Sequence, residues 1–73
     1  MEIFQQRLRQ IRKSSGLTQE EAAKQLQIPY RSYRRYETGE AEPGISTAAA
    51  IADFFNVSLD YLSGLTQDTS LRR

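Results

Sequence analysis

Residues 17–40 read LTQEEAAKQLQIPYRSYRRYETGE, and the fold is decided in this stretch. Thr18 and Glu21 have the spacing of a capping box, which predicts the start of a helix over Gln19–Leu26. A second helix is predicted over Tyr30–Thr38, only about three residues further on. So short a connection makes the two helices pack at an angle, in the arrangement that presents the second helix outwards.

Helical periodicity continues on both sides of this pair. Upstream, apolar residues recur at helical spacing over Phe4–Ile11, and Gly16 marks the end of that helix. Downstream, Ile45–Phe55 has the spacing of a fourth helix, and a short fifth helix is capped by Ser58 and closed by Gly64. Because no segment alternates in the manner of a strand, the sequence predicts a compact all-α domain of five helices.

The composition allows one small domain and excludes several kinds of chemistry. The 73 residues include no cysteine and no histidine, so disulfides, thiolate metal sites and histidine-assisted nucleophiles are excluded. The remaining candidate bases are carboxylates on solvated segments, and we expect neither an enzyme nor a metal or cofactor site; the enzyme alternative left open is a nuclease built on acidic metal ligands. We expect the domain to occupy residues 1–65, followed by a flexible C-terminal tail over residues 66–73. No signal peptide or membrane-spanning run is visible, which predicts a cytoplasmic protein without a membrane partner.

The net charge of +1 conceals an uneven distribution along the chain. Residues 1–39 contain eight Lys or Arg and four Asp or Glu, whereas residues 40–71 contain five acids and no basic residue. Arg72 and Arg73 supply the remaining positive charge. A basic half beside an acidic half indicates nucleic acid as a partner, although small domains also segregate charge by chance.

The second helix of the central pair concentrates residues suited to nucleic acid. Residues 29–36 read PYRSYRRY, with three arginines and no acid. Helical geometry puts Tyr33 and Tyr36 on one inner face. The outer positions are Tyr30, Arg31, Arg34 and Arg35. Arginine can donate two hydrogen bonds to guanine or neutralise a phosphate. On a lone helix this face could simply be solvated, but the helix-turn-helix spacing places it on the helix that enters the major groove.

At this point the chain resembles a known family, the phage repressor and Cro type of helix-turn-helix, also called the xenobiotic-response-element type. The stretch quoted above carries the resemblance, and ISTAAAIADFFNVSLDYLSG over residues 45–64 is similar to that family's fourth and fifth helices. The resemblance covers residues 3–65. It implies a lambda-repressor-like DNA-binding domain of a sequence-specific transcriptional regulator, and a repressor in particular.

The resemblance implies DNA-contacting roles for particular residues. Gln19 matches a glutamine that touches the DNA backbone, where the free N–H groups of a helix N-terminus also favour phosphate. Tyr30, Arg31 and Arg35 match positions that read bases. Arg34 lies beside them and could serve a base or a phosphate.

The family pattern also bears on Thr38, on an expected ion pair and on the turn between the two central helices. Thr38 matches the loop that approaches the DNA backbone, but the nearby Glu40 would repel phosphate. Arg12 and Glu37 match a partly buried ion pair, although Arg12 could instead be an exposed contact to phosphate. Gln27 departs from the pattern, because the family commonly has glycine in this turn, where the backbone often needs a positive φ.

The resemblance also implies pairing on double-stranded DNA. We expect a weak homodimer, promoted by a pseudo-palindromic operator, because one such motif reads only a few base pairs. Phe54, Tyr61 and Leu65 are expected to be exposed and to form the contact between protomers. The alternative is a protein-interaction module or antitoxin that reuses the fold, with the acidic half as its partner surface.

Overall fold

The computed structural model describes residues 2–69, which form five α-helices and contain no strand. The helices are α1 (Glu2–Ser14), α2 (Gln19–Leu26), α3 (Tyr30–Thr38), α4 (Ile45–Phe54) and α5 (Leu59–Ser63). The all-α prediction is confirmed, and the two central helices begin and end at the residues expected from the sequence.

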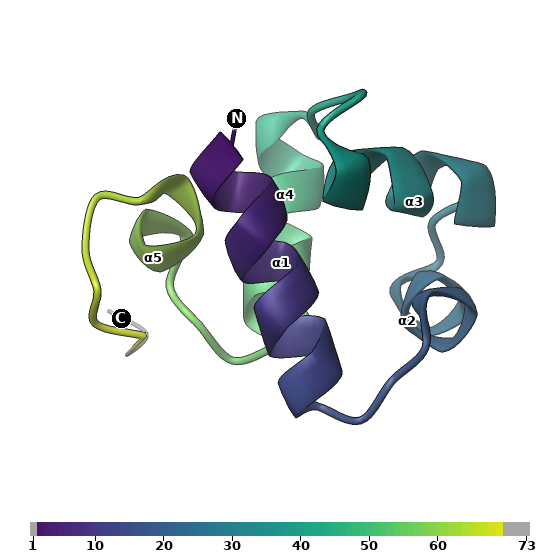
Figure 1. Cartoon of the computed structure of the whole chain (residues 1–73), viewed down its shortest axis with the longest axis horizontal. Coiled ribbons are helices and arrows are strands. Elements are labelled where there is room, and N and C mark those ends of the chain that lie inside the picture. Colours follow the sequence, from purple (N-terminus) through teal and green to yellow (C-terminus); the bar gives the residue numbers. More distant parts are fainter. Residues whose placement is uncertain (1, 70–73) are drawn as a thin grey trace.

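The helices surround a core to which each of them contributes. In Figure 1, α1 crosses the front of the molecule, with α5 on one side of it and α2 and α3 on the other. The buried hydrophobic cluster consists of Phe4, Leu8, Ala22, Ala23, Tyr33, Ile51, Ala52, Val57 and Leu62. Tyr33 is the only member from α3, and its side chain is fully buried. The core therefore fixes which face of α3 points inwards.

The helix ends follow the capping signals in the sequence. The Glu21 amide donates to Thr18 Oγ1 at 3.1 Å and the Thr18 amide donates to Glu21 Oε1 at 2.9 Å, so the predicted capping box is confirmed. Gly39 ends α3 at φ +84°. This left-handed backbone favours glycine, and a Cβ here would lie 1.7 Å from Gln5 Oε1, so the end of the Gln5 side chain would also have to move.

Arg7 connects α1 to the end of α5 and to the segment that follows it. Its guanidinium donates to the carbonyl of Tyr61 and, at 2.7 Å, to that of Thr66, and it lies 4.3 Å from the centre of the Tyr61 ring. The Ser58 amide donates to the carbonyl of Thr69 at 3.0 Å. Residues 66–69 thus fold back against α5. The flexibility expected for the tail stays a prediction, and residues 70–73 lie outside the described residues.

The turn between α2 and α3 is closed by a residue with a left-handed backbone. Gln27 has φ 59° and ψ 38°, and its amide donates to the Lys24 carbonyl at 3.1 Å. The amide of Ile28 donates to the Ala23 carbonyl at 2.9 Å. Pro29 follows directly before α3, where its missing N–H is harmless. Because Gln27 has a Cβ, it carries steric strain in this conformation that a glycine would not.

Replacing Gln27 with glycine should stabilise the fold. Relief of the left-handed strain outweighs the greater freedom of an unfolded glycine, and we expect Gln27→Gly to raise stability by about 0.5–1 kcal/mol. In a domain of this size, 1 kcal/mol shifts the melting temperature by roughly 4–8 °C. Gln25→Gly inside α2 is the matched control and should destabilise by about 1 kcal/mol. Equal losses for both variants in thermal melts would show that the turn is unstrained.

Candidate nucleic-acid interface

The two sides of α3 have opposite characters. Tyr33 and Glu37 are buried on the inner side, with 0% and 1% of their surface exposed. The outward side chains, all exposed, are Arg31, Arg34, Arg35 and Thr38. At about 100° per residue, these four lie within an arc of roughly 100°. The inner side holds the helix in place while the outer side stays available to a partner.

The arginines of this outer arc carry uncompensated positive charge. None of Arg31, Arg34 and Arg35 forms an ion pair with another residue of the described range 2–69. The guanidinium of Arg34 lies 6.0 Å from the centre of the Tyr30 ring, a cation–π contact within the same helix. A cluster of unpaired guanidinium groups on one helix face favours a polyanionic partner.

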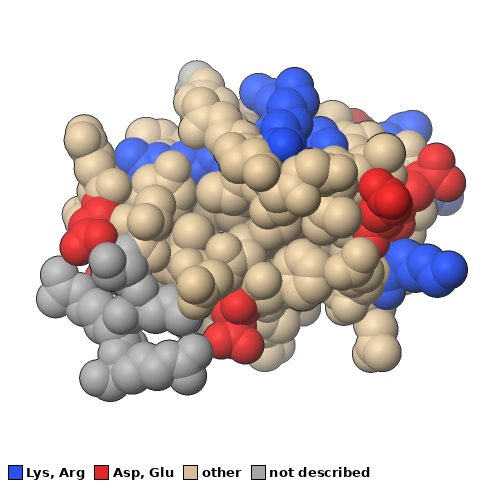
Figure 2. Space-filling model, turned by 90° about the horizontal axis from the view of Figure 1, so that it is seen from below, with Lys and Arg blue, Asp and Glu red and all other residues tan. Residues whose placement is uncertain are grey.

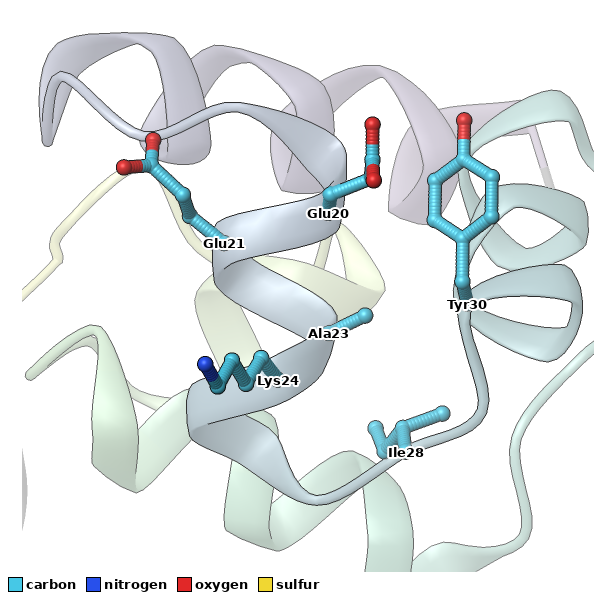
Figure 3. Close-up of a pocket in the computed structure, with 6 residues that line it drawn as sticks. All are labelled: Glu20, Glu21, Ala23, Lys24, Ile28 and Tyr30. Atoms are coloured by element: carbon cyan, nitrogen blue, oxygen red, sulfur yellow. The ribbon is translucent and has the colours of Figure 1, made fainter.

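Tyr30 stands at the edge of this arc and borders a shallow hollow of about 370 Å³ between α2 and α3. Figure 3 shows the Tyr30 ring beside the carboxylate of Glu20, with Ala23 and Ile28 lining the gap between the helices. Because Glu20 brings negative charge to one edge, the hollow does not extend the anion-attracting surface. Tyr30 itself is 43% exposed and accessible from outside.

Beneath the arc, the Glu37 carboxylate joins three helices. Arg12 of α1 donates from Nε to Glu37 Oε2 at 2.6 Å and from Nη2 to Oε1 at 3.1 Å. The Tyr33 hydroxyl donates to Oε2 at 2.5 Å, and Gln19 Nε2 of α2 donates to Oε1 at 3.1 Å. Arg12 is 8% exposed and also donates to the carbonyl of Leu17. The structure thus places Arg12 in a buried ion pair and not on the surface.

The hydrogen bonds keep this buried pair charged. Burial by itself raises the pKa of Glu37, but the bonds from Arg12, Tyr33 and Gln19 outweigh it and hold that pKa below its usual value. The hydrogen bond to Glu37 in turn raises the pKa of Arg12. Burial, followed by the contact with Glu37, raises the pKa of Tyr33, so its hydroxyl stays a donor.

Gln19, expected from the sequence to contact DNA, opens α2, and its side chain is partly engaged inside the protein. It is the first residue of α2 and half-buried, and one of its amide N–H groups serves Glu37. The contribution of Gln19 and Tyr33 to the network was not predicted. Tyr33 stands four residues before Glu37 on one helix face, a spacing that could have revealed its contact. Nothing local in the sequence signals the contact made by Gln19.

Comparison with known protein families gives a match over residues 8–62, to the family described as Helix-turn-helix. This chain belongs to the helix-turn-helix family. The matched range begins in α1 and ends in α5, with the angled pair α2 and α3 in its middle. The predicted similarity to phage repressors is confirmed, because the matches include one that is named a phage transcriptional repressor.

Its curated helix-turn-helix relatives are transcriptional regulators by name. The chain is 39% identical to the uncharacterized HTH-type transcriptional regulator YobD of Bacillus subtilis, over 90% of this chain and 59% of YobD. It is 38% identical to the HTH-type transcriptional regulator ImmR of the same organism, over 80% of this chain and 46% of ImmR. It is 37% identical to the cryptic phage CTXphi transcriptional repressor RstR of Vibrio cholerae, over 84% of this chain and 54% of RstR.

The chain spans about half the length of these curated helix-turn-helix relatives. No solved structure gives a significant match. None of the helices within residues 2–69 is long and apolar enough to cross a membrane. The same residues contain no group of three or more His, Cys, Asp or Glu placed to hold a metal ion.

The last turn of α3 in this helix-turn-helix domain combines a hydroxyl with an acid. Thr38 Oγ1 donates to Glu40 Oε1 at 3.0 Å and lies 3.2 Å from the carbonyl oxygen of Arg35. The structure therefore brings a carboxylate to the end of the arginine arc.

On the face seen from below in Figure 2, the charged side chains stand mainly around the rim and most of the middle is uncharged. That face offers a polyanion no continuous basic surface.

Loss of the Glu37 carboxylate should destabilise the free protein. Glu37→Ala leaves the Arg12 guanidinium buried without its partner, at an expected loss of about 3–5 kcal/mol for a fully buried pair. Thermal unfolding followed by circular dichroism, in the absence of DNA, measures the effect. Glu20→Ala removes an exposed acid from α2 and is the matched control. Similar melting temperatures for the two variants would mean that the ion pair contributes nothing.

Proposed function

We propose that this domain binds double-stranded DNA and regulates transcription, with α3 reading base edges in the major groove. The observation that carries the proposal is the outward arc of α3, whose three arginines have no acidic partner within residues 2–69. Arginine is the side chain best suited to guanine O6 and N7, and it also binds phosphate. The names of ImmR and RstR, both transcriptional regulators, support the same function.

Two further residues would anchor the domain to the DNA backbone. Gln19 stands at the N-terminus of α2, where free backbone N–H groups attract phosphate, and its second amide N–H has no partner among the described residues. Thr38 would approach a phosphate from the other end of α3. Such contacts set the position of α3 on the duplex, whereas Tyr30, Arg31 and Arg35 would supply the sequence preference.

We infer repression as the mode of regulation. A bound domain represses when it covers promoter DNA, which needs no catalytic step, cofactor or second ligand. RstR is named a repressor, whereas the transcriptional activator BcrR of Enterococcus faecalis is 34% identical over 81% of this chain and 29% of its own length. The protein would act in the cytoplasm, where bacterial operators are accessible.

Alanine substitutions in the arc test base reading by α3. With a preferred site selected from random duplexes, Arg31→Ala or Arg35→Ala should weaken binding by about 1–3 kcal/mol and relax the preference at one base pair. Arg9→Ala removes an equal charge from an exposed position on α1 and should leave the preference intact. If both α3 variants bind all sequences more weakly by one common factor, these arginines contact phosphates and the base-reading role is wrong.

We further propose that two protomers share a pseudo-palindromic operator. Leu65 is 78% and Phe54 38% exposed, and α5 lies across α1 from α3, so a pairing surface there would leave α3 free for DNA. Tyr61 offers less surface than expected, because it is half-buried and its ring is covered by Arg7. So small a patch supports a weak dimer, which DNA would promote by holding the two reading helices about 34 Å apart.

Sedimentation of the protein with and without its site measures this assembly. We expect a monomer at micromolar concentration and two protomers per site on DNA. Leu65→Asp should weaken the second binding step without altering the first, because the variant keeps α3 unchanged. One protomer per specific site, with no second step, would contradict the dimer.

A further inference from the structure

We propose that Glu40 sets the DNA affinity of this domain by occupying a hydrogen-bond donor that a phosphate would otherwise use. The inference rests on the proposed DNA-binding function and adds a residue that acts against it. The carboxylate of Glu40, at the end of α3, competes with a DNA phosphate for the hydroxyl of Thr38.

The position of Thr38 makes this competition possible. Thr38 follows Arg34 by four residues and Arg31 by seven, so its hydroxyl lies in the same outward arc as the guanidinium groups. That hydroxyl donates to Glu40 Oε1 at 3.0 Å, and both side chains are exposed. The negative charge of Glu40 therefore lies within the surface that would meet DNA, not on a remote part of the loop.

The fold does not need this hydrogen bond. The Thr38 hydroxyl has a second acceptor in the carbonyl of Arg35 at 3.2 Å, and the left-handed Gly39 already ends the helix. Glu40 forms no ion pair within residues 2–69, so its charge stabilises no other element. The clearest physical effect of this charge is to repel an anion that approaches the arginine arc.

That effect falls on phosphates and not on bases. A hydroxyl has one hydrogen to donate, so a phosphate oxygen must compete for it with the Arg35 carbonyl and with the nearer, charged carboxylate of Glu40. The displaced carboxylate remains close by and repels the phosphate. Because every duplex presents phosphates, the loss of affinity should be nearly the same for a preferred site and for random DNA.

The experiment compares wild-type protein with Glu40→Gln, which keeps the size of the side chain and removes its charge. Dissociation constants are measured over a range of KCl concentrations for the selected site and for a random-sequence duplex. At low salt, Glu40→Gln should bind both duplexes about three- to tenfold more tightly. The slope of log K against log salt should become steeper by about one, as expected for one more phosphate contact.

Two further variants separate a local from a general charge effect. Asp60→Asn removes an equal charge from α5, on the far side of α1 from α3, and should change affinity far less. The amide oxygen that Glu40→Gln introduces can still accept from Thr38, but without charge it competes less well with phosphate. In the double variant Glu40→Gln with Thr38→Val, most of the gain should be lost, because the donor for which they compete is absent. Circular dichroism verifies that all variants are folded.

Each result decides between the proposals. Unchanged affinity for Glu40→Gln, or equal gains for Glu40→Gln and Asp60→Asn, would overturn the role of Glu40 while the DNA-binding function stands. Failure of the wild-type protein and of Glu40→Gln to bind any duplex would overturn both.

Discussion

The carboxylate of Glu37 accepts hydrogen bonds from α1, α2 and α3 together, and the orientation of α3 depends on it. A charge buried this completely is tolerated only when every lone pair is used, since an unpaired ion would lose several kcal/mol of solvation. Arg12, Tyr33 and Gln19 meet that requirement, and among the described residues no buried side-chain polar atom lacks a partner. Rotation of α3 about its axis would break the whole set at once. The network therefore acts as a rotational lock on the helix.

The two sides of α3 have separate roles: the inner side fixes its orientation and the outer arc is exposed to a partner. Tyr33 and Glu37 face the core, whereas the arginines face solvent and have no acidic partner among the described residues. Gln19 links the two sides, because one of its amide N–H groups supports Glu37 while its backbone opens α2. A phosphate bound near Gln19 would thus be positioned by the same carboxylate that orients the outward arc of α3. In our proposal, the negative charge of Glu40 opposes the approach of phosphate at the end of this arc.

Local signals in the sequence were sufficient for most of the fold. The caps at Thr18 and Ser58 and the apolar periodicity predicted the helices, and the missing glycine at Gln27 drew attention to a turn that is indeed left-handed. Long-range side-chain contacts were a different matter. The bonds from Arg7 to α5 and from Gln19 to Glu37 join residues far apart in sequence, so no spacing rule can reveal them. The expected DNA contacts rest on resemblance and charge, because the free domain shows which side chains are available and not what they bind.

The separation of inward and outward positions on α3 has a consequence for how such domains can diverge. The residues that fix the helix, Tyr33 and Glu37, lie on one face of its nine residues, and the exposed residues on the opposite face take no part in the core. Substitutions at the outward places alter the chemistry of the surface without disturbing the packing beneath it. A single scaffold can therefore acquire new binding preferences by point mutation, each step leaving a folded protein on which selection can act.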